Sequence, residues 1–366
     1  MRGYKEFSTM NFTLKDVCSQ FDVYTNIDSY GNGHINDTYL CETDPAFILQ
    51  RINTKIFTNP KKLMENIFYV TEHIKAKITQ AGGDVKRETL SVIKTKDGEN
   101  YYKADDENYF RMYDFVADTV THDFVENPQQ LYNAAKAFGK FQRMLDDFDA
   151  EKLYETIVDF HTTPKRVEQL QQAIKQNAAN RLEAVQPELE EALKYAKYAD
   201  KIVNAIAAGE VPVRVTHNDT KLNNVLFDAK TDEGICVIDL DTVMPGSALY
   251  DFGDALRFGA STGAEDETDL DKIEFDLERF EAFTKGFLEE TADCLTKKEI
   301  ELLPLSALIM TYECGIRFLA DYLNGDTYFK IHREHHNLDR ARTQLKLVKD
   351  IESKLDKMAE IVNKYI

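Results

Sequence analysis

Five polar residues in the second half of the chain stand at spacings that chemistry could use. The run from His217 to Asn224 reads H-x-D-x-K-x-x-N, and Asp239 follows later, directly after two apolar residues. In a loop, the Asp219 carboxylate could accept the proton of an acceptor hydroxyl, while Lys221 could stabilise the charge of a moving phosphoryl group. Asn224 and Asp239 offer the oxygen ligands that Mg²⁺ prefers, and His217 would brace the loop. These residue types in this order predict phosphoryl transfer from a magnesium-bound nucleotide.

A second interpretation of the same residues is a polar strand–turn–strand without catalysis. That interpretation leaves the apolar-apolar-Asp sequence at 237–239 unexplained, so we favour the catalytic one.

The triplet Asp251-Phe252-Gly253 offers another place for a metal-binding carboxylate. We assign that role to Asp239 instead, because Asp239 follows an apolar strand and lies nearer to Asn224 in the sequence. Asp251 and Asp254 are expected to cap or brace the next helix.

The elements that must position these residues fall into two parts. Residues 1–115 predict an N-lobe of strands with one long helix, because Gly- and Asn-containing turns separate short apolar runs. Asn59-Pro60 is a helix start, and Gly82 is a helix stop. The expected strands are 23–29, 35–41, 47–53, 90–95, 101–104 and 109–116, and the expected helix is 60–81.

Residues 116–366 predict a larger C-lobe that is mainly helical. The expected helices are 128–145, 164–180, 189–207, 271–289, 298–323 and 338–365, and short strands are expected at 211–216, 224–227 and 235–240. A strand, not a Gly/Ser linker, runs across the boundary near residue 115, so the two lobes should be closely hinged. The predicted class is α+β, with a small β-rich lobe and a larger helical lobe.

The motifs and this order of elements resemble the aminoglycoside phosphotransferase/choline kinase family, the small-molecule relatives of protein kinases. The resemblance covers nearly the whole chain and implies a bilobal protein-kinase-like fold, ATP as co-substrate and Mg²⁺. Within the family, the stretches 31–36, 47–53 and 337–343 are similar to the N-acetylhexosamine 1-kinases.

The resemblance implies nucleotide contacts in the N-lobe. The turn of Gly31, Asn32 and Gly33 would cover the phosphates, although most such turns are simple hairpins. The lysine expected on the third strand is missing, and Arg51 is the cation there, with Glu65 as a possible partner; Glu65 could equally be a solvated surface residue. Met112 and Phe115, at the hinge, would present backbone groups to the adenine.

The acceptor pocket is expected beside Asp219. Arg317 stands among apolar residues of a helix, so it is either in an ion pair, with Asp321 one turn on, or a ligand to substrate oxygens. His34, Asp241, Phe258 and Tyr328 are further candidates for the pocket, and the aromatic ones could equally be core residues.

The predicted activity is direct, in-line phosphorylation of the anomeric hydroxyl of N-acetylglucosamine or N-acetylgalactosamine, giving the 1-phosphate. Aminoglycoside, choline and homoserine kinases are the alternatives within the family. A catalytically silent pseudokinase or binding protein is the alternative from another class, and it would be expected to lack Asp219 or Asp239.

Composition narrows the partners and the compartment. The chain has 366 residues, and 45 Lys and Arg against 64 Asp and Glu give a formal net charge of −19, which argues against a nucleic-acid partner. Five cysteines without paired spacing predict neither a disulfide framework nor a zinc ribbon. We expect no segment that spans a membrane, a cytoplasmic location, and a monomer or homodimer.

Overall fold

An antiparallel sheet forms the centre of the N-terminal part of the protein. The computed structural model describes residues 12–31 and 35–366. In the sheet, β1, β2, β3, β6 and β4 lie side by side in that order, and β5 also pairs with β6. The strands are β1 (Ile27–Ser29), β2 (Asp37–Cys41), β3 (Phe47–Ile52), β4 (Val92–Ile93), β5 (Tyr102–Lys103) and β6 (Tyr109–Asp114). The predicted order of three strands, a helix and three more strands is confirmed.

The two faces of this sheet carry different partners because successive side chains of a strand point to opposite faces. On the outer face, Leu49 of β3 and Met112 of β6 are fully buried in a cluster with residues of the short helix α2 (Leu14–Ser19). On the inner face, Ile52 packs with the long helix α3 (Pro60–Ala81). The sequence pattern does not predict α2, because six residues are too few to show a helical period.

Helix α3 forms where the sequence predicts it. Asn59 caps its first turn by accepting a hydrogen bond from the backbone N–H of Lys62, and Pro60 occupies the first turn. Gly82 ends the helix with φ 73°, the left-handed conformation that glycine adopts without strain. The apolar side chains at helical spacing, including Leu63 and Ile67, are buried against the sheet side.

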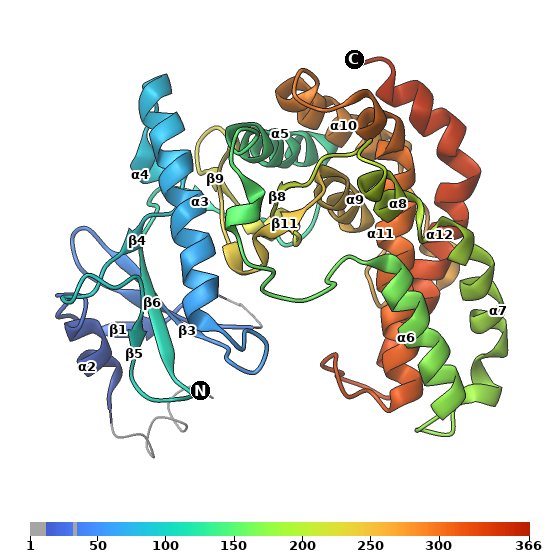
Figure 1. Ribbon diagram of the computed structural model, residues 1–366, viewed down its shortest axis with the longest axis horizontal. Coiled ribbons are helices and arrows are strands. Elements are labelled where there is room, and N and C mark those ends of the chain that lie inside the picture. Colours follow the sequence, from blue (N-terminus) through green and yellow to red (C-terminus); the bar gives the residue numbers. More distant parts are fainter. Residues whose placement is uncertain (1–11, 32–34) are drawn as a thin grey trace.

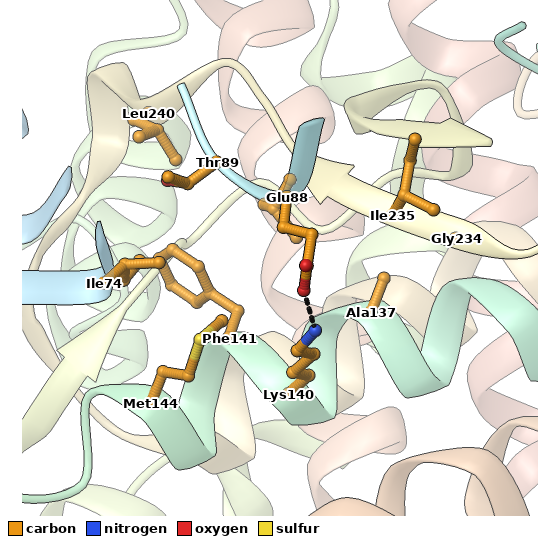
Figure 2. A pocket seen from close by; sticks show the side chains of 11 residues that line it. Ile74, Glu88, Thr89, Ala137, Lys140, Phe141, Met144, Gly234, Ile235 and Leu240 are labelled. Atoms are coloured by element: carbon orange, nitrogen blue, oxygen red, sulfur yellow. Dashed lines mark hydrogen bonds and ion pairs between the residues drawn. The ribbon is translucent and has the colours of Figure 1, made fainter. Parts of the chain in front are cut away.

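The sheet-bearing part and the helical part share one hydrophobic cluster. That cluster runs from α3 to α5 (Pro128–Met144) and to the strands β9 (Val225–Asp228) and β10 (Gly234–Val237). Beside it, Glu88 at the end of α4 (Val85–Glu88) contacts the ammonium of Lys140 on α5, over a cavity of about 20 Å³ (Figure 2). This cavity has room for about one water molecule, so the two parts are closely packed here.

The C-terminal part is built mainly of helices, which lie at the right of Figure 1. They are α6 (Thr163–Gln176), α7 (Gln186–Tyr195), α8 (Lys201–Ala207), α9 (Ala248–Gly259), α10 (Leu277–Thr291), α11 (Lys297–Asn324) and α12 (His336–Val362). The prediction of one helix over 189–207 is wrong, because a 3-10 turn separates α7 from α8. The predicted start at 271 is also wrong, since α10 begins at Leu277, and α9 was not among the expected elements.

Two small sheets lie between the two parts (Figure 1). In one, β8 (Arg214–Thr216) pairs with β11 (Met244–Gly246). In the other, β9 lies between β10 and β7 (Thr119–Val120). The strands expected over 211–216, 224–227 and 235–240 correspond to β8, β9 and β10, whereas β7 and β11 were not among the expected strands. The loop from β8 to β9 carries most of the predicted chemistry.

Helix α11 is long and strongly apolar. Its most apolar 18-residue window has a mean hydropathy of 1.3, and among the described helices it is the one long and apolar enough to cross a membrane by composition. However, 89% of that window is buried inside the protein, where α6, α9 and α12 pack around it. We therefore interpret α11 as the central core helix.

Helix α9 packs so closely on α11 that position 253 has no room for a side chain. A Cβ atom there would lie 2.5 Å from the carbonyl oxygen of Ser306 and 2.6 Å from Cγ of Met310. The substitution Gly253→Ala should therefore force the helices apart and lower the free energy of unfolding by about 1–3 kcal/mol. Urea unfolding measures this loss. As a control, Gln171→Ala on the exposed side of α6 should change the free energy by less than about 0.5 kcal/mol; an equal effect of both substitutions would contradict the packing argument.

Candidate active site

The 217–224 loop brings three of the predicted residues within hydrogen-bond distance. Lys221 Nζ lies 2.7 Å from Oδ1 of Asp219. The side-chain amide of Asn224 donates to the other carboxylate oxygen of Asp219 at 3.1 Å and to the Asp219 carbonyl at 2.8 Å. A 3-10 turn over Leu222–Asn224 places the Asn224 side chain for these bonds. The Asp219 carboxylate is thus held at both oxygens.

The electrostatics of this pair keep both groups charged. Burial raises the pKa of the Asp219 carboxyl, but the ammonium of Lys221 and the bonds from Lys221 and Asn224 outweigh burial, so the pKa lies below its ordinary value. Burial likewise opposes the charge on Lys221, and the Asp219 carboxylate more than compensates, so the pKa of Lys221 is raised. The loop therefore presents a carboxylate that can accept a hydroxyl proton beside a cation that can bind a phosphoryl oxygen.

His217 fastens this loop to the strand that precedes Asp239. Its Nδ1 accepts the backbone N–H of Asp219 at 3.2 Å, and its Nε2 lies 2.8 Å from the carbonyl oxygen of Ile238. This pairing corresponds to a neutral imidazole with the proton on Nε2. The rings of Phe138 and Phe141 contact the imidazole edge to face. These contacts agree with the bracing role expected of His217.

Helix α9 holds the loop from the other side through two carboxylates. Asp251, which is buried, accepts the backbone N–H of His217 at 2.9 Å and that of Asn218 at 2.8 Å. Asp254 accepts the backbone N–H of Thr220 at 3.2 Å. Both aspartates are therefore braces of the 217–224 loop, not caps of α9, whose N-cap is Ser247. Because both oxygens of Asp251 are engaged, its carboxylate suits this bracing role better than a metal site.

Asp239 has the surroundings of a cation ligand. Burial and the neighbouring carboxylates of Asp241 and Asp219 raise the pKa of Asp239 to about 6. Its backbone adopts the left-handed conformation, with φ 59° and ψ 57°. A divalent cation would relieve the repulsion among these carboxylates, so the residues fit the magnesium expected here. Within the described ranges, no three His, Cys, Asp or Glu side chains gather as a metal site, so nucleotide phosphates would have to complete the ligand set.

Asp241 does not offer its carboxylate to a substrate, contrary to expectation. The guanidinium of Arg111, on β6, contacts one oxygen of Asp241, and the side-chain amide of Asn36 donates to the other at 2.6 Å. The Asp241 side chain is only 4% exposed. Both oxygens are used inside the protein, in bonds that join the sheet to the segment after β10.

Two N-lobe residues with predicted nucleotide contacts lie on the outer face of the sheet. Arg51 shares the outer face of β3 with Leu49, away from α3, and its guanidinium lies 3.3 Å from Asp37. Met112 is fully buried on the same outer face, and its backbone pairs with Leu49 inside the sheet. The geometry therefore does not support phosphate binding by Arg51 or adenine binding by Met112. Gln50 and Arg111 occupy the inner face instead.

Other predicted nucleotide residues are placed near the hinge or fall outside the described ranges. Phe115 is half-buried, and its ring packs edge to face on Tyr30 with the centroids 5.9 Å apart. Gly31 follows Tyr30 with φ 72°, a turn conformation. Asn32, Gly33 and His34 lie outside the described residues, so the predictions for them stay predictions.

The ion pair considered for Glu65 is not formed with Arg51. Glu65 pairs with Lys62 one turn earlier on α3, at 3.0 Å, as a surface residue would. The neighbouring Asn66, fully buried, is the α3 residue that reaches across: its amide donates to the carbonyls of Tyr154 at 2.7 Å and Val243 at 3.0 Å. Asn66 therefore ties α3 to the segment that follows Asp239.

Arg317 faces aromatic rings, not the carboxylate of Asp321. Its guanidinium carbon lies 5.4 Å, 5.5 Å and 6.0 Å from the ring centroids of Phe160, Phe329 and Tyr328. Asp321 instead accepts hydrogen bonds from three backbone N–H groups of the loop after α11. The alternative of an Arg317–Asp321 ion pair is therefore wrong. The Tyr328 ring is 67% exposed, so this group of rings is open to solvent on one side.

Phe258 and the Arg317 helix both approach the 217–224 loop. Lys221 Nζ lies 5.6 Å from the centroid of the Phe258 ring, so Phe258 lies next to the Lys221–Asp219 pair. One turn before Arg317, the Glu313 carboxylate lies 2.8 Å from Nδ1 of His161, and Nε2 of His161 lies 3.3 Å from the Asn218 carbonyl. His161 and Glu313 thus connect α11 to the loop.

Sequence reasoning missed Arg111, Asn66, His161 and Glu313. Each is a buried polar side chain whose partner is far away in the sequence. A signal was present for Arg111 and Glu313, since a charged residue inside an apolar run needs a partner. The sequence does not indicate which partner that is.

The comparisons with known proteins agree with this geometry. A model of the phosphotransferase enzyme family matches residues 27–283. An aminoglycoside phosphotransferase from Alicyclobacillus acidocaldarius has a TM-score of 0.61 at 12% identity, over 97% of this chain and 98% of that one. An amicoumacin kinase, solved with AMP-PNP and Ca²⁺, has a TM-score of 0.60 at 12% identity over 96% of both chains. A microcompartment-associated aminopropanol kinase has a TM-score of 0.56 at 14% identity, over 94% of this chain and 98% of that one.

The likeness to these structures, at such low identity, establishes the fold: the predicted kinase-like α+β fold is confirmed. The family match rests on sequence and includes the 217–224 loop and Asp239. The chain therefore belongs to the phosphotransferase enzyme family, and its fold is like that of the aminoglycoside phosphotransferase and the two kinases named above.

Proposed function

We propose that the protein is an ATP-dependent kinase that phosphorylates the anomeric hydroxyl of an N-acetylhexosamine to the 1-phosphate. The observation that carries the transfer chemistry is the ionised Asp219 carboxylate. One of its oxygens lies 2.7 Å from the Lys221 ammonium, and the other accepts a hydrogen bond from Asn224. A silent pseudokinase would not need this pair together with Asp239. The expected cytoplasmic location, the monomeric or homodimeric state and the lobe boundary at residue 115 stay predictions.

Asp219 is the proposed base. Its carboxylate would accept the proton of the acceptor hydroxyl as that oxygen attacks the terminal phosphorus, with direct in-line transfer. Lys221 would move its hydrogen bond from Asp219 to an oxygen of the transferred phosphoryl group, which strengthens the base as the charge develops. The hydrogen bonds of His217 and Asp251 keep the loop in place. This matters because a displacement of Asp219 by about 1 Å would lower the transfer rate considerably.

Asn224 and Asp239 are the proposed holders of Mg²⁺. The Asn224 amide nitrogen faces Asp219, which leaves its carbonyl oxygen for the ion. When bound, the ion would neutralise part of the charge on the nucleotide phosphates. Gly31, Asn32, Gly33 and Phe115 remain the proposed nucleotide contacts, with Tyr30 added because its ring packs on Phe115.

Arg317 supports an uncharged, oxygen-rich acceptor. A guanidinium that faces aromatic rings can donate hydrogen bonds to hydroxyl or amide oxygens, and it repels a cationic acceptor such as choline or an aminoglycoside. Tyr328 and Phe258 would pack against the sugar ring, and His34 remains a proposed substrate contact. Arg317 and Tyr328 lie beyond residue 283, outside the stretch that the family model matches, so a screen of acceptors tests this part of the proposal separately.

A substrate screen tests the activity. We expect phosphate transfer from Mg²⁺·ATP to N-acetylglucosamine or N-acetylgalactosamine, seen as a sugar 1-phosphate by phosphorus NMR. Glucosamine, choline, homoserine and an aminoglycoside, which carry an ammonium group, should react at least about tenfold more slowly, since a charge repulsion of 1.4 kcal/mol is enough for that ratio. Faster transfer to one of these ammonium-bearing compounds would contradict the proposed acceptor.

Removal of the base should separate catalysis from binding. The substitution Asp219→Asn should lower kcat by about 10²–10⁴-fold, because an amide cannot accept the proton. Mg²⁺·ADP affinity, measured by calorimetry, should stay within a few-fold of wild type. As a control, Asn223→Ala, at an exposed position in the same loop, should leave kcat nearly unchanged. Most of the turnover surviving in Asp219→Asn would refute the assignment.

Loss of Arg317 should affect the acceptor and not the nucleotide. We expect Arg317→Ala to raise the acceptor KM or lower kcat by about tenfold or more, the equivalent of one lost charged hydrogen bond, while the KM for ATP is unchanged. Lys297→Ala, at the exposed start of the same helix, is the matched control. If the melting temperature falls sharply while the folded enzyme keeps normal kinetics, Arg317 is structural.

A further inference from the structure

A buried ion pair joins the sheet to the segment that carries Asp239. Among the described residues, Arg111 on β6 is the largest side chain that is almost completely buried, with 1% of it exposed. Its guanidinium contacts the carboxylate of Asp241, which is 4% exposed. Removing a guanidinium from water costs free energy unless the charge is paired, so the buried Arg111 side chain requires the Asp241 carboxylate as its partner.

Arg111 is itself held in one orientation. Its Nε donates to the side-chain oxygen of Gln50 at 3.0 Å, from the strand directly alongside, and its guanidinium carbon lies 5.3 Å from the centroid of the Tyr113 ring. Gln50 and Arg111 are register partners in β3 and β6. The guanidinium therefore projects from the inner face of the sheet in a fixed direction, toward the helical part of the protein.

The segment that receives this contact is fastened at two further points. Asn36 donates to the second oxygen of Asp241 at 2.6 Å, and its own oxygen accepts the backbone N–H of Asn53 at 3.0 Å. Asn66, on α3, donates to the carbonyl of Val243 at 3.0 Å. Residues of the sheet and of α3 thus hold both Asp241 and Val243, just after the proposed metal ligand.

The direction of the Asp239 side chain depends on the turn that carries it. Its φ of 59° lies in the left-handed region, which aspartate and asparagine adopt in turns more readily than other residues with a side chain. Asp241 lies two residues on, at the same 3-10 turn over Leu240–Thr242. A contact that fixes Asp241 therefore limits how far the turn, and with it the Asp239 side chain, can move.

We propose that Arg111 is a positioning residue: through Asp241 it fixes the turn that aims the Asp239 carboxylate at the metal-bound nucleotide. The inference rests on the proposed function, since it assigns Asp239 to the metal site. Arg111 is too deeply buried to touch the nucleotide itself. A buried ion pair is a poor source of stability compared with apolar packing, but it specifies one geometry, which is what a metal site requires.

Three variants and one matched control test this role. Arg111→Met should lower the melting temperature, because it leaves the Asp241 carboxylate buried and unpaired, and it should weaken Mg²⁺·ADP binding at least tenfold. The double variant Arg111→Met with Asp241→Leu removes both charges, so most of the melting temperature should return while the nucleotide affinity stays weak. Arg111→Lys should restore part of the affinity, since it keeps the charge but loses the planar fork.

The control is Arg87→Met. Arg87, on α4, pairs with Asp228 of β9 at 2.7 Å, so it also joins the two parts of the protein, but away from Asp239. Its loss should leave Mg²⁺·ADP affinity within twofold of wild type. All affinities are measured by calorimetry well below the melting temperatures, without an acceptor, and the KM values for Mg²⁺·ATP and for acceptor are measured separately.

Two results would overturn the inference. If the double variant regains wild-type Mg²⁺·ADP affinity together with its melting temperature, Arg111 is structural and does not position Asp239. If Arg111→Met raises the KM for acceptor and not that for Mg²⁺·ATP, the residue acts elsewhere. Failure of the proposed function is a separate result: wild-type protein that binds Mg²⁺·ADP but phosphorylates no N-acetylhexosamine refutes the acceptor and leaves the role of Arg111 standing.

Discussion

The active-site region depends on one buried carboxylate, that of Asp251. The 217–224 loop leaves β8 and can no longer satisfy its backbone N–H groups in a sheet, and Asp251 accepts two of them. Asp251 lies on α9, and α9 packs on the central helix α11 through Gly253. The core of the helical part therefore determines the position of the loop. Asp219 is then placed by backbone that cannot move without breaking buried hydrogen bonds.

The charges around this loop act locally and owe little to the net charge of −19. Asp219 is kept ionised by Lys221, whereas Asp239 is buried near other carboxylates and has its pKa raised to about 6. The surroundings of these two aspartates thus shift their pKa values in opposite directions, as suits a base and a cation ligand. The Arg111–Asp241 pair and the bonds of Asn36 and Asn66 bring the sheet against the second of these aspartates.

Elements with several agreeing local signals could be predicted from the sequence, whereas others, among them the helix α9, could not. Helix α3 has a cap, a helical apolar period and a glycine stop, so local signals agree. The helix α2 and the strands β7 and β11 span too few residues to show a period, and packing decides whether they form. The placement of Arg51 could not be predicted for a similar reason. Successive side chains of a strand point to opposite faces of the sheet, and only the neighbouring strand and helix show which face is the inner one.

The sequence by itself determined the chemistry that is available: an acid, a lysine and an amide at fixed spacing, followed by an aspartate after an apolar strand, which identify a phosphotransferase. The separation of these residues along the chain is short enough for local structure to bring Asp219, Lys221 and Asn224 together. Only the tertiary structure decided the partners of the buried charges. Arg111 meets Asp241 and Glu313 meets His161 across more than a hundred residues of chain, because burial requires each charge to find a partner while sequence distance places no restriction on which one.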